Sequence, residues 1–112
     1  MEIHQTTIGN AEHLELVGDL DSFSVNLLRE RINRLFDESR YNIVVNLGSV
    51  NFVDSAGLGQ LVAALKMAVH HGGDLILVNP NESVKDLLRI TKLETVFRRY
   101  DTVEEAISVF PA

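Results

Sequence analysis

The sequence predicts an α/β fold, with a mixed β-sheet of about four to five strands and about four α-helices packed mainly on one side. Three patterns support this prediction. A hairpin pattern opens the chain, two short apolar runs follow it, and helical periodicity separates and succeeds those runs. With 112 residues and neither a repeat nor a linker-like stretch, residues 1–112 are expected to form a single domain.

Two strands are expected first, at residues 2–8 and 12–20, joined by a Gly-Asn turn. In the second strand, Leu14, Leu16 and Leu20 share one face under period-two alternation, and mostly polar residues occupy the other. The chain therefore opens with a hairpin that has one solvent-facing side.

A helix and a strand-helix-strand unit are expected next. Residues 24–36 carry apolar side chains at three- and four-residue spacing, which indicates an amphipathic surface helix. The runs 43–47 and 75–78 are short and almost wholly apolar, as in strands covered on both faces. A second helix, from about Ala56 to His70, lies between them, so the two strands should be parallel neighbours joined by a crossover.

Capping signals define the last elements. Asn79 is followed by Pro80, which favours Asn79 as the cap of a third helix with the proline in its first position. A short edge strand is expected at residues 96–100. Thr102 and Glu105 then form a capping-box pattern, which predicts a fourth, short helix at the end of the chain.

Composition excludes several classes of function. The formal net charge of −6 leaves no excess of Lys and Arg, which disfavours direct binding to nucleic acid or to an anionic membrane. No apolar stretch approaches the roughly 20 residues that span a bilayer, and no secretory signal pattern is present, so we expect a cytoplasmic protein. The absence of cysteine excludes disulfides, thiolate metal ligands and a cysteine nucleophile.

The segment between the apolar strand 43–47 and the next helix is the first candidate site, because it follows the carboxyl end of a strand. Ser55 falls at the helix start, where free N–H groups and the helix dipole favour a negative charge. Gly57 and Gly59 leave little bulk around Ser55, so another protein's active site can approach it. The alternative interpretation is that Asp54 or Ser55 only caps the helix and the glycines serve packing.

The segment Asp54-Ser55-Ala56-Gly57-Leu58-Gly59 after an apolar strand, with Gly18-Asp19-Leu20-Asp21 upstream, resembles the STAS domain of bacterial anti-sigma factor antagonists. The resemblance covers essentially the whole chain, including the order of its elements. It implies that Ser55 is phosphorylated by an anti-sigma factor that is also an ATP-dependent serine kinase, and that a serine phosphatase reverses the modification. It further implies that the unphosphorylated chain binds the anti-sigma factor and frees a sigma factor, and that phosphorylation releases it.

The same resemblance suggests which residues form the switch surface. Asp54 matches the loop aspartate of the family, and Asp21 matches the aspartate that ends its second strand beside the phosphorylation loop. Together with residues 56–59, these two aspartates are expected to contact the partner. Ala56 stands where family members often have a second hydroxyl residue, which leaves Ser55 without a rival acceptor. For Asp21 the alternative is that it helps to cap the first helix.

Enzymatic functions find little support, and neither a cofactor nor catalysis is expected. Ser55 has no base within its motif and no Gly-x-Ser-x-Gly elbow, and no lysine follows the glycines as in a phosphate-binding loop. His70 and His71 are adjacent in the last turn of a helix, so they do not point the same way as a metal-binding pair would.

The identity of the client stays open. STAS-like domains also regulate secretion, signalling phosphatases, stress complexes and membrane transporters, and the switch loop does not distinguish these clients.

Overall fold

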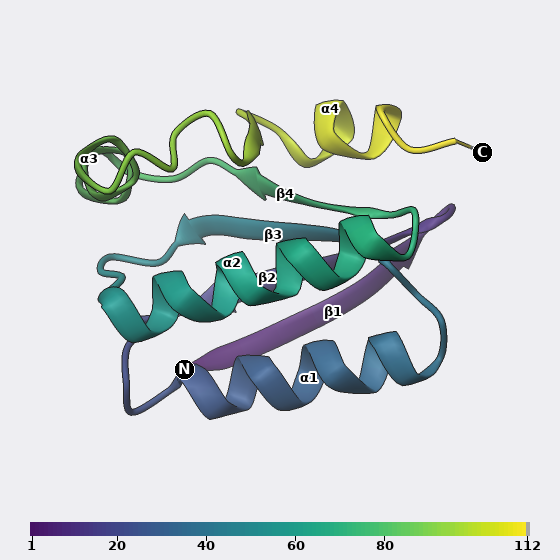
Figure 1. Cartoon of the computed structure of the whole chain (residues 1–112), viewed down its shortest axis with the longest axis horizontal. Helices are drawn as coiled ribbons and strands as arrows, with labels where there is room; N and C mark the ends of the chain where they lie inside the picture. The colour runs from purple at the N-terminus through teal and green to yellow at the C-terminus, as the bar shows by residue number, and fades with distance from the viewer. Residues whose placement is uncertain (112) are drawn as a thin grey trace.

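The computed structural model describes residues 1–111 and confirms the predicted α/β class (Figure 1). Five strands form one sheet in the order β1-β2-β3-β4-β5, with β1 and β2 antiparallel and all later neighbours parallel. The strands are Glu2–Ile8 (β1), Ala11–Val17 (β2), Asn42–Ser49 (β3), Asp74–Val78 (β4) and Arg98–Tyr100 (β5). The helices are Val25–Asp37 (α1), Ser55–His70 (α2), Glu82–Ile90 (α3) and Val103–Ser108 (α4).

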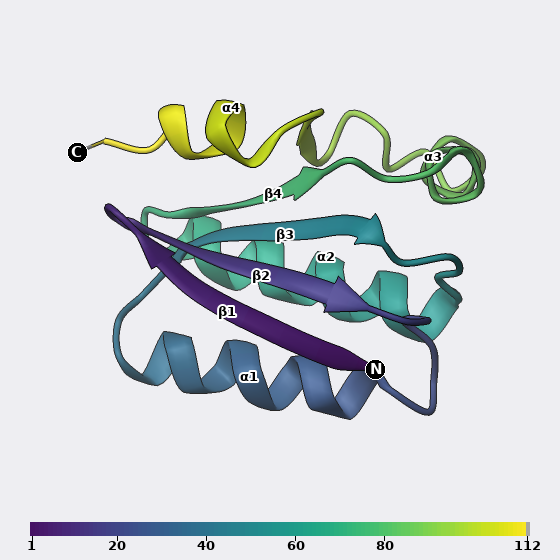
Figure 2. The ribbon, with the colours of Figure 1, turned by 180° about the vertical axis from the view of Figure 1, so that it is seen from behind.

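The helices cover the two faces of the sheet unequally. α1, α2 and α3 all contribute buried residues to the larger apolar core. α4 packs on the other face, where Ala106 joins a smaller cluster with Ala11, Val44 and Ile76. Figure 1 shows α2 in front of the sheet, and Figure 2, seen from behind, shows the strands in front of α2. The prediction that the helices pack mainly on one side is therefore confirmed.

The central strands are buried on both faces, as their apolar runs predict. In β3, the consecutive residues Ile43, Val44 and Val45 have no exposed surface. Successive residues of a strand point to opposite faces, so burial of all three requires a layer of helix on each side. This strand leads directly into the candidate loop, which therefore starts from a rigid position.

Two strands, β2 and β5, are shorter than predicted. β2 ends at Val17 and not at residue 20, because the register with β3 shifts between Glu15 and Val17. Gly18 then adopts a positive φ of 108°, which glycine reaches without strain. Pairing resumes only as an isolated bridge at Leu20. The last strand is also shorter, at Arg98–Tyr100.

The cap of α3 is a correction to the sequence analysis. Asn81, and not Asn79, is the N-cap, and its side-chain oxygen accepts from the N–H of Val84 at 2.9 Å. Asn79 instead adopts a positive φ of 54°, which turns the chain before the proline. The predicted cap of α4 is confirmed, since Thr102 accepts from the N–H of Glu105. None of the helices in residues 1–111 is long and apolar enough to cross a membrane.

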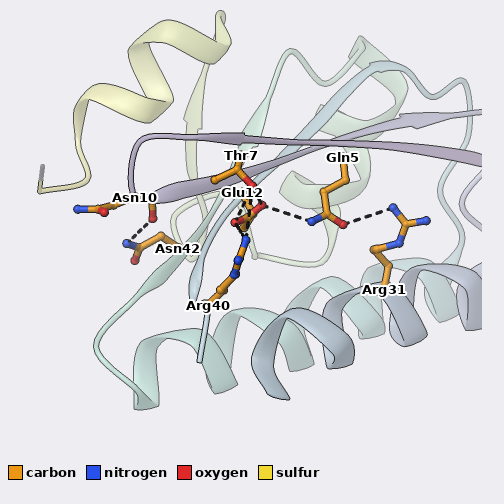
Figure 3. Close-up of polar contacts among 7 residues, drawn as sticks. All are labelled: Gln5, Thr7, Asn10, Glu12, Arg31, Arg40 and Asn42. Atoms are coloured by element: carbon orange, nitrogen blue, oxygen red, sulfur yellow. Dashed lines mark hydrogen bonds and ion pairs between the residues drawn. The ribbon is translucent and has the colours of Figure 1, made fainter. Parts of the chain in front are cut away.

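An ion pair between buried Glu12 and half-exposed Arg40 closes the amino end of the sheet (Figure 3). Glu12 is only 4% exposed. Its carboxylate accepts from the Arg40 guanidinium at 2.7 Å and from the Thr7 hydroxyl at 2.8 Å. Gln5 donates to Glu12 at 3.4 Å, and Arg31 donates to Gln5. The network, which we call the Glu12 network, joins the β1–β2 hairpin to α1 and to the turn that follows it.

The sequence analysis did not single out Glu12, although the alternation of side chains along its strand indicates that Glu12 faces the core. Glu12 shares strand parity with Leu14 and Leu16, which face the helices, whereas His13 and Glu15 have the opposite parity. A carboxylate on the apolar face of a strand needs a partner. The partner comes from a turn 28 residues away, which no local pattern identifies.

Candidate functional site

The two motifs that carry the family resemblance meet at the carboxyl end of β2 and β3. The N–H of Leu20 donates to the carbonyl of Phe52 at 2.9 Å, and the N–H of Asp54 donates to the carbonyl of Leu20 at 3.2 Å. An isolated parallel bridge joins Leu20 to Val53 between these bonds. The β2–β3 pairing thus continues past the regular strands and brings the Asp21 segment beside the start of α2.

Asp54 ties these two segments together with one carboxylate. It is the N-cap of α2, and one carboxylate oxygen accepts from the N–H of Gly57 at 2.9 Å. The other oxygen accepts from the N–H of Ser22 at 3.1 Å. Asp54 therefore fixes both the helix start and the neighbouring turn, which is a larger role than the capping alternative assigned to it.

Ser55 is the first residue of α2 and is exposed. The first N–H groups of a helix have no intrahelical acceptor, and here the Asp54 carboxylate accepts that of Gly57, while the Leu58 N–H makes the first regular helical bond, to the Asp54 carbonyl. The N–H groups of Ser55 and Ala56 lack an intrahelical acceptor by the same geometry. An anion on the Ser55 side chain would lie at the positive end of a 16-residue helix.

The two glycines of the motif have different structural roles. A Cβ on Gly57 would collide with the carbonyl oxygen of Leu20 and lie 2.8 Å from Leu20 Cγ, so the close approach of the two segments requires glycine. A Cβ on Gly59 would meet nothing within 4 Å. Packing therefore explains Gly57 but not Gly59, which lies one helical turn from Ser55 on the same face.

The other motif residues differ in exposure. Leu58 is 6% exposed and belongs to the larger core, so it anchors α2 and offers little surface. Ala56 is partly buried. Among the predicted switch residues of α2, Ser55 and Gly59 are the exposed ones.

Asp21 shapes the turn before α1. Its carboxylate accepts from the N–H groups of Phe23 at 3.0 Å and Ser24 at 3.1 Å. Ser24 is the N-cap residue of α1, but its side chain makes no capping bond and donates instead to the carbonyl of Asp19 at 2.7 Å. Asp21 thus takes up backbone donors at the entry to α1, the geometry that the capping alternative describes.

The histidines at the end of α2 lie away from this region. His71 stacks on Tyr41 with ring centroids 4.3 Å apart, and its Nδ1 lies 3.0 Å from the carbonyl oxygen of Met67. No group of three His, Asp or Glu side chains within residues 1–111 is arranged to hold a metal ion.

Sequence reasoning missed two features of this region. The amide nitrogen of Asn81 donates to the carbonyls of Val50 at 3.3 Å and Asn51 at 3.2 Å, so the cap of α3 also holds the loop before Ser55. Phe23 is 96% exposed beside the Asp54 bond to Ser22. The sequence signal for Phe23 is an aromatic residue in an otherwise polar turn. No pattern in the residues around Asn81 indicates that its side chain bonds to the loop at residues 50 and 51.

Comparison with known proteins agrees with this geometry. Residues 3–106 match the model of the STAS domain family. The chain is 36% identical over 90 residues to a Thermotoga neapolitana protein described as an anti-sigma factor antagonist, covering 80% of each. It is 32% identical over 87 residues to the anti-sigma-B factor antagonist of Bacillus subtilis, covering 78% of this chain and 79% of that one.

A solved structure supports the same assignment. The crystal structure of a Thermotoga maritima protein described as an anti-sigma factor antagonist superposes with a TM-score of 0.90 at 27% identity, over 95% of this chain and 92% of that one. The chain, a mixed five-stranded sheet whose third strand leads to a helix capped by Asp54, belongs to the STAS domain family. Within that family its relatives are the anti-sigma factor antagonists.

Proposed function

We propose that this chain is an anti-sigma factor antagonist that binds an anti-sigma factor when Ser55 is unmodified and releases it when Ser55 is phosphorylated. The observation that carries the proposal is the placement of Ser55. It is exposed, it begins a helix capped by Asp54, and it lies where the two motif segments meet. A kinase can reach its hydroxyl without unfolding any element.

The modification is a phosphoryl transfer made by the partner. The γ-phosphoryl group of ATP moves to Ser55 Oγ, the bond to the ADP oxygen breaks, and a base of the kinase accepts the hydroxyl proton. A serine phosphatase returns the hydroxyl by hydrolysis. The chain itself supplies the acceptor and no catalytic base, so it has no turnover of its own. The client is a sigma factor, which places the proposed switch in the cytoplasm.

Local electrostatics supports a switch that leaves the fold intact. The phosphate adds about −1.5 to −2 charge at neutral pH, next to Asp54. The unpaired N–H groups and the dipole of α2 offset that repulsion in the free chain. At a protein interface the same charge is desolvated, and an uncompensated buried charge costs about 2–5 kcal/mol. That corresponds to a loss of roughly 30-fold to several thousand-fold in affinity, enough to release the partner.

The proposal is tested with three baits: the wild-type chain, Ser55→Ala and Ser55→Asp. The wild type and Ser55→Ala are expected to capture an anti-sigma factor with an ATP-binding kinase domain, and Ser55→Asp is expected to lose it. With ATP, that protein should add one phosphate to the wild type, on Ser55. Mass spectrometry that places the stoichiometric phosphate on Ser22, Ser24 or Ser83 would contradict the proposal.

A further inference from the structure

The most exposed large apolar side chain of the described residues lies in the turn that Asp54, the neighbour of Ser55, holds by a hydrogen bond. Phe23 is 96% exposed, in the turn between β2 and α1. Its backbone N–H is held by the Asp21 carboxylate at 3.0 Å, and the preceding N–H, of Ser22, is held by Asp54 at 3.1 Å. The ring thus stands in solvent on a backbone fixed by two hydrogen bonds.

Two further apolar side chains accompany Phe23. Leu27 lies four residues further on, in the first turn of α1, and is 50% exposed. Phe52 is 49% exposed in the loop before Ser55, and its carbonyl is bound to the N–H of Leu20. We call Phe23, Leu27 and Phe52 the apolar rim. Phe23 and Leu27 lie at the entry to α1, and Phe52 precedes α2 in the segment that is hydrogen-bonded to Leu20. Grouped exposed apolar side chains mark interaction surfaces.

The charge of the same surface indicates what covers it. Residues 18–24 and 50–57 contain three carboxylates, those of Asp19, Asp21 and Asp54, and neither Lys nor Arg. Apolar side chains among carboxylates, as at Phe23 and Phe52, are complementary to an apolar pocket flanked by basic side chains. They are not complementary to a second copy of the same surface, because identical negative surfaces repel.

We propose that Phe23 is the apolar anchor with which this chain docks on its anti-sigma factor, in a pocket flanked by Lys or Arg. Asp21 and Asp54 are positioning residues: they bind backbone N–H groups and hold the anchor beside Ser55. This inference rests on the proposed function and adds to it the residue that confers affinity. Aromatic anchors of this kind carry much of the binding energy of protein interfaces.

The test compares Phe23→Ala with a matched control, Ile90→Ala. Ile90 is 76% exposed on α3, so both variants remove a large exposed apolar side chain and leave the core untouched. The probe is the purified anti-sigma factor that the wild type binds and Ser55→Asp does not. Phe23→Ala should weaken its binding at least tenfold, and raise the KM for phosphorylation of Ser55 with kcat unchanged. Ile90→Ala should change neither quantity more than twofold, and Phe23→Leu should recover part of the affinity.

The positioning role has a separate measurement. Asp21→Ala removes both a carboxylate that complements the basic pocket and the acceptor that holds Phe23, so it should weaken binding more than Asp21→Asn, which keeps an acceptor and removes the charge alone. Equal losses in the two variants would show that Asp21 acts through its charge and does not position Phe23. Wild-type affinity should fall as salt rises from 50 to 500 mM, since the partner's pocket is basic; an affinity independent of salt would reject that pocket.

The two proposals fail in distinguishable ways. If Phe23→Ala binds like the wild type while Ser55→Asp does not bind, Phe23 is not the anchor and the switch function stands. If the wild type captures no kinase-type anti-sigma factor, the proposed function itself fails, whatever Phe23 does.

Discussion

The two ends of the sheet use carboxylates in opposite ways. At the amino end, Glu12 is buried and bonded to the side chains of Arg40 and Thr7. At the carboxyl end, Asp21 and Asp54 accept from backbone N–H groups. A side chain bound to side chains stabilises one packed arrangement. A side chain bound to backbone fixes the course of a loop and leaves the neighbouring side chains free for a partner.

This difference separates stability from switching. A phosphate at Ser55 changes the charge of an exposed side chain, and the Glu12 network lies at the far end of the same strands, opposite the start of β3. We therefore expect changes at the amino end to alter stability and not partner binding. Changes at exposed side chains of the carboxyl end should alter partner binding, whereas Gly57 and Asn81, which hold its segments together, should alter stability.

The largest expected effect is that of Gly57→Ala. The added Cβ collides with backbone of Leu20, which cannot turn aside as a flexible side chain can, so the free energy of unfolding should fall by about 2–3 kcal/mol. Denaturant unfolding measures it. The matched control is Gly59→Ala in the same helix, where the space is open. A loss below about 0.5 kcal/mol would mean that the two segments separate easily, and that the carboxyl end is not fixed by close packing.

The second effect is at the amino end. Glu12→Gln keeps the size of the side chain but removes the charge that holds Arg40, and should lower the free energy of unfolding by about 1–2 kcal/mol. The Arg40 side chain is half exposed, so it can turn to solvent when the charge of Glu12 is removed, which limits the loss of stability. Glu30→Gln, at an exposed position of α1, is the control and should change little. A changed affinity of Glu12→Gln for the anti-sigma factor would show that the amino end of the sheet also affects partner binding.

The pH dependence of that pair has a definite sign. Hydrogen bonding and charge attraction from Glu12 raise the pKa of Arg40 above its ordinary value. A group with a raised folded-state pKa contributes stability that is complete below its unfolded pKa and is lost only as pH rises through the folded pKa. For arginine both values lie far above neutrality. The difference in unfolding free energy between wild type and Arg40→Met should thus be the same at pH 7 and pH 9.

Sequence reasoning performs differently at the two ends for a physical reason. The start of α2 is defined by neighbouring residues, since Asp54, Ser55 and Gly57 lie within four residues. The preceding apolar strand, the capping residue and the helical periodicity are therefore enough to predict the position of Ser55. The Glu12 network joins residues that are distant in sequence, and its geometry exists only after the sheet has formed. The same reason explains the misplaced cap of α3. Asn79 and Asn81 both suit a cap, and Asn81 is selected by the carbonyls of Val50 and Asn51 that it also reaches.

A third, smaller effect concerns Asn81, which connects α3 to the loop before Ser55. Asn81→Ser can still cap α3 but loses the amide donors to the loop, whereas Asn81→Ala loses both. Each function should contribute about 1 kcal/mol to stability. Hydrogen exchange should be faster at residues 50–54 in both variants, and at the first turn of α3 only in Asn81→Ala. Equal protection of the loop in all three chains would show that Asn81 serves α3 alone.

The smallest expected effect, and the one that best separates stability from binding, is that of Gly59→Ala. Glycine inside a helix costs about 0.5–1 kcal/mol relative to alanine, and the open space at Gly59 gives no packing in return, so the variant should be more stable by about that amount. The added methyl group stands one turn from Ser55 on the same face of α2, where the proposed partner approaches. We therefore expect severalfold weaker binding to the anti-sigma factor together with a higher unfolding midpoint. A more stable variant with unchanged affinity would show that the partner does not touch this turn of the helix, and would confine the docking surface to the Phe23 side of Ser55. A less stable variant would indicate a packing role for Gly59 that the open space around it does not predict.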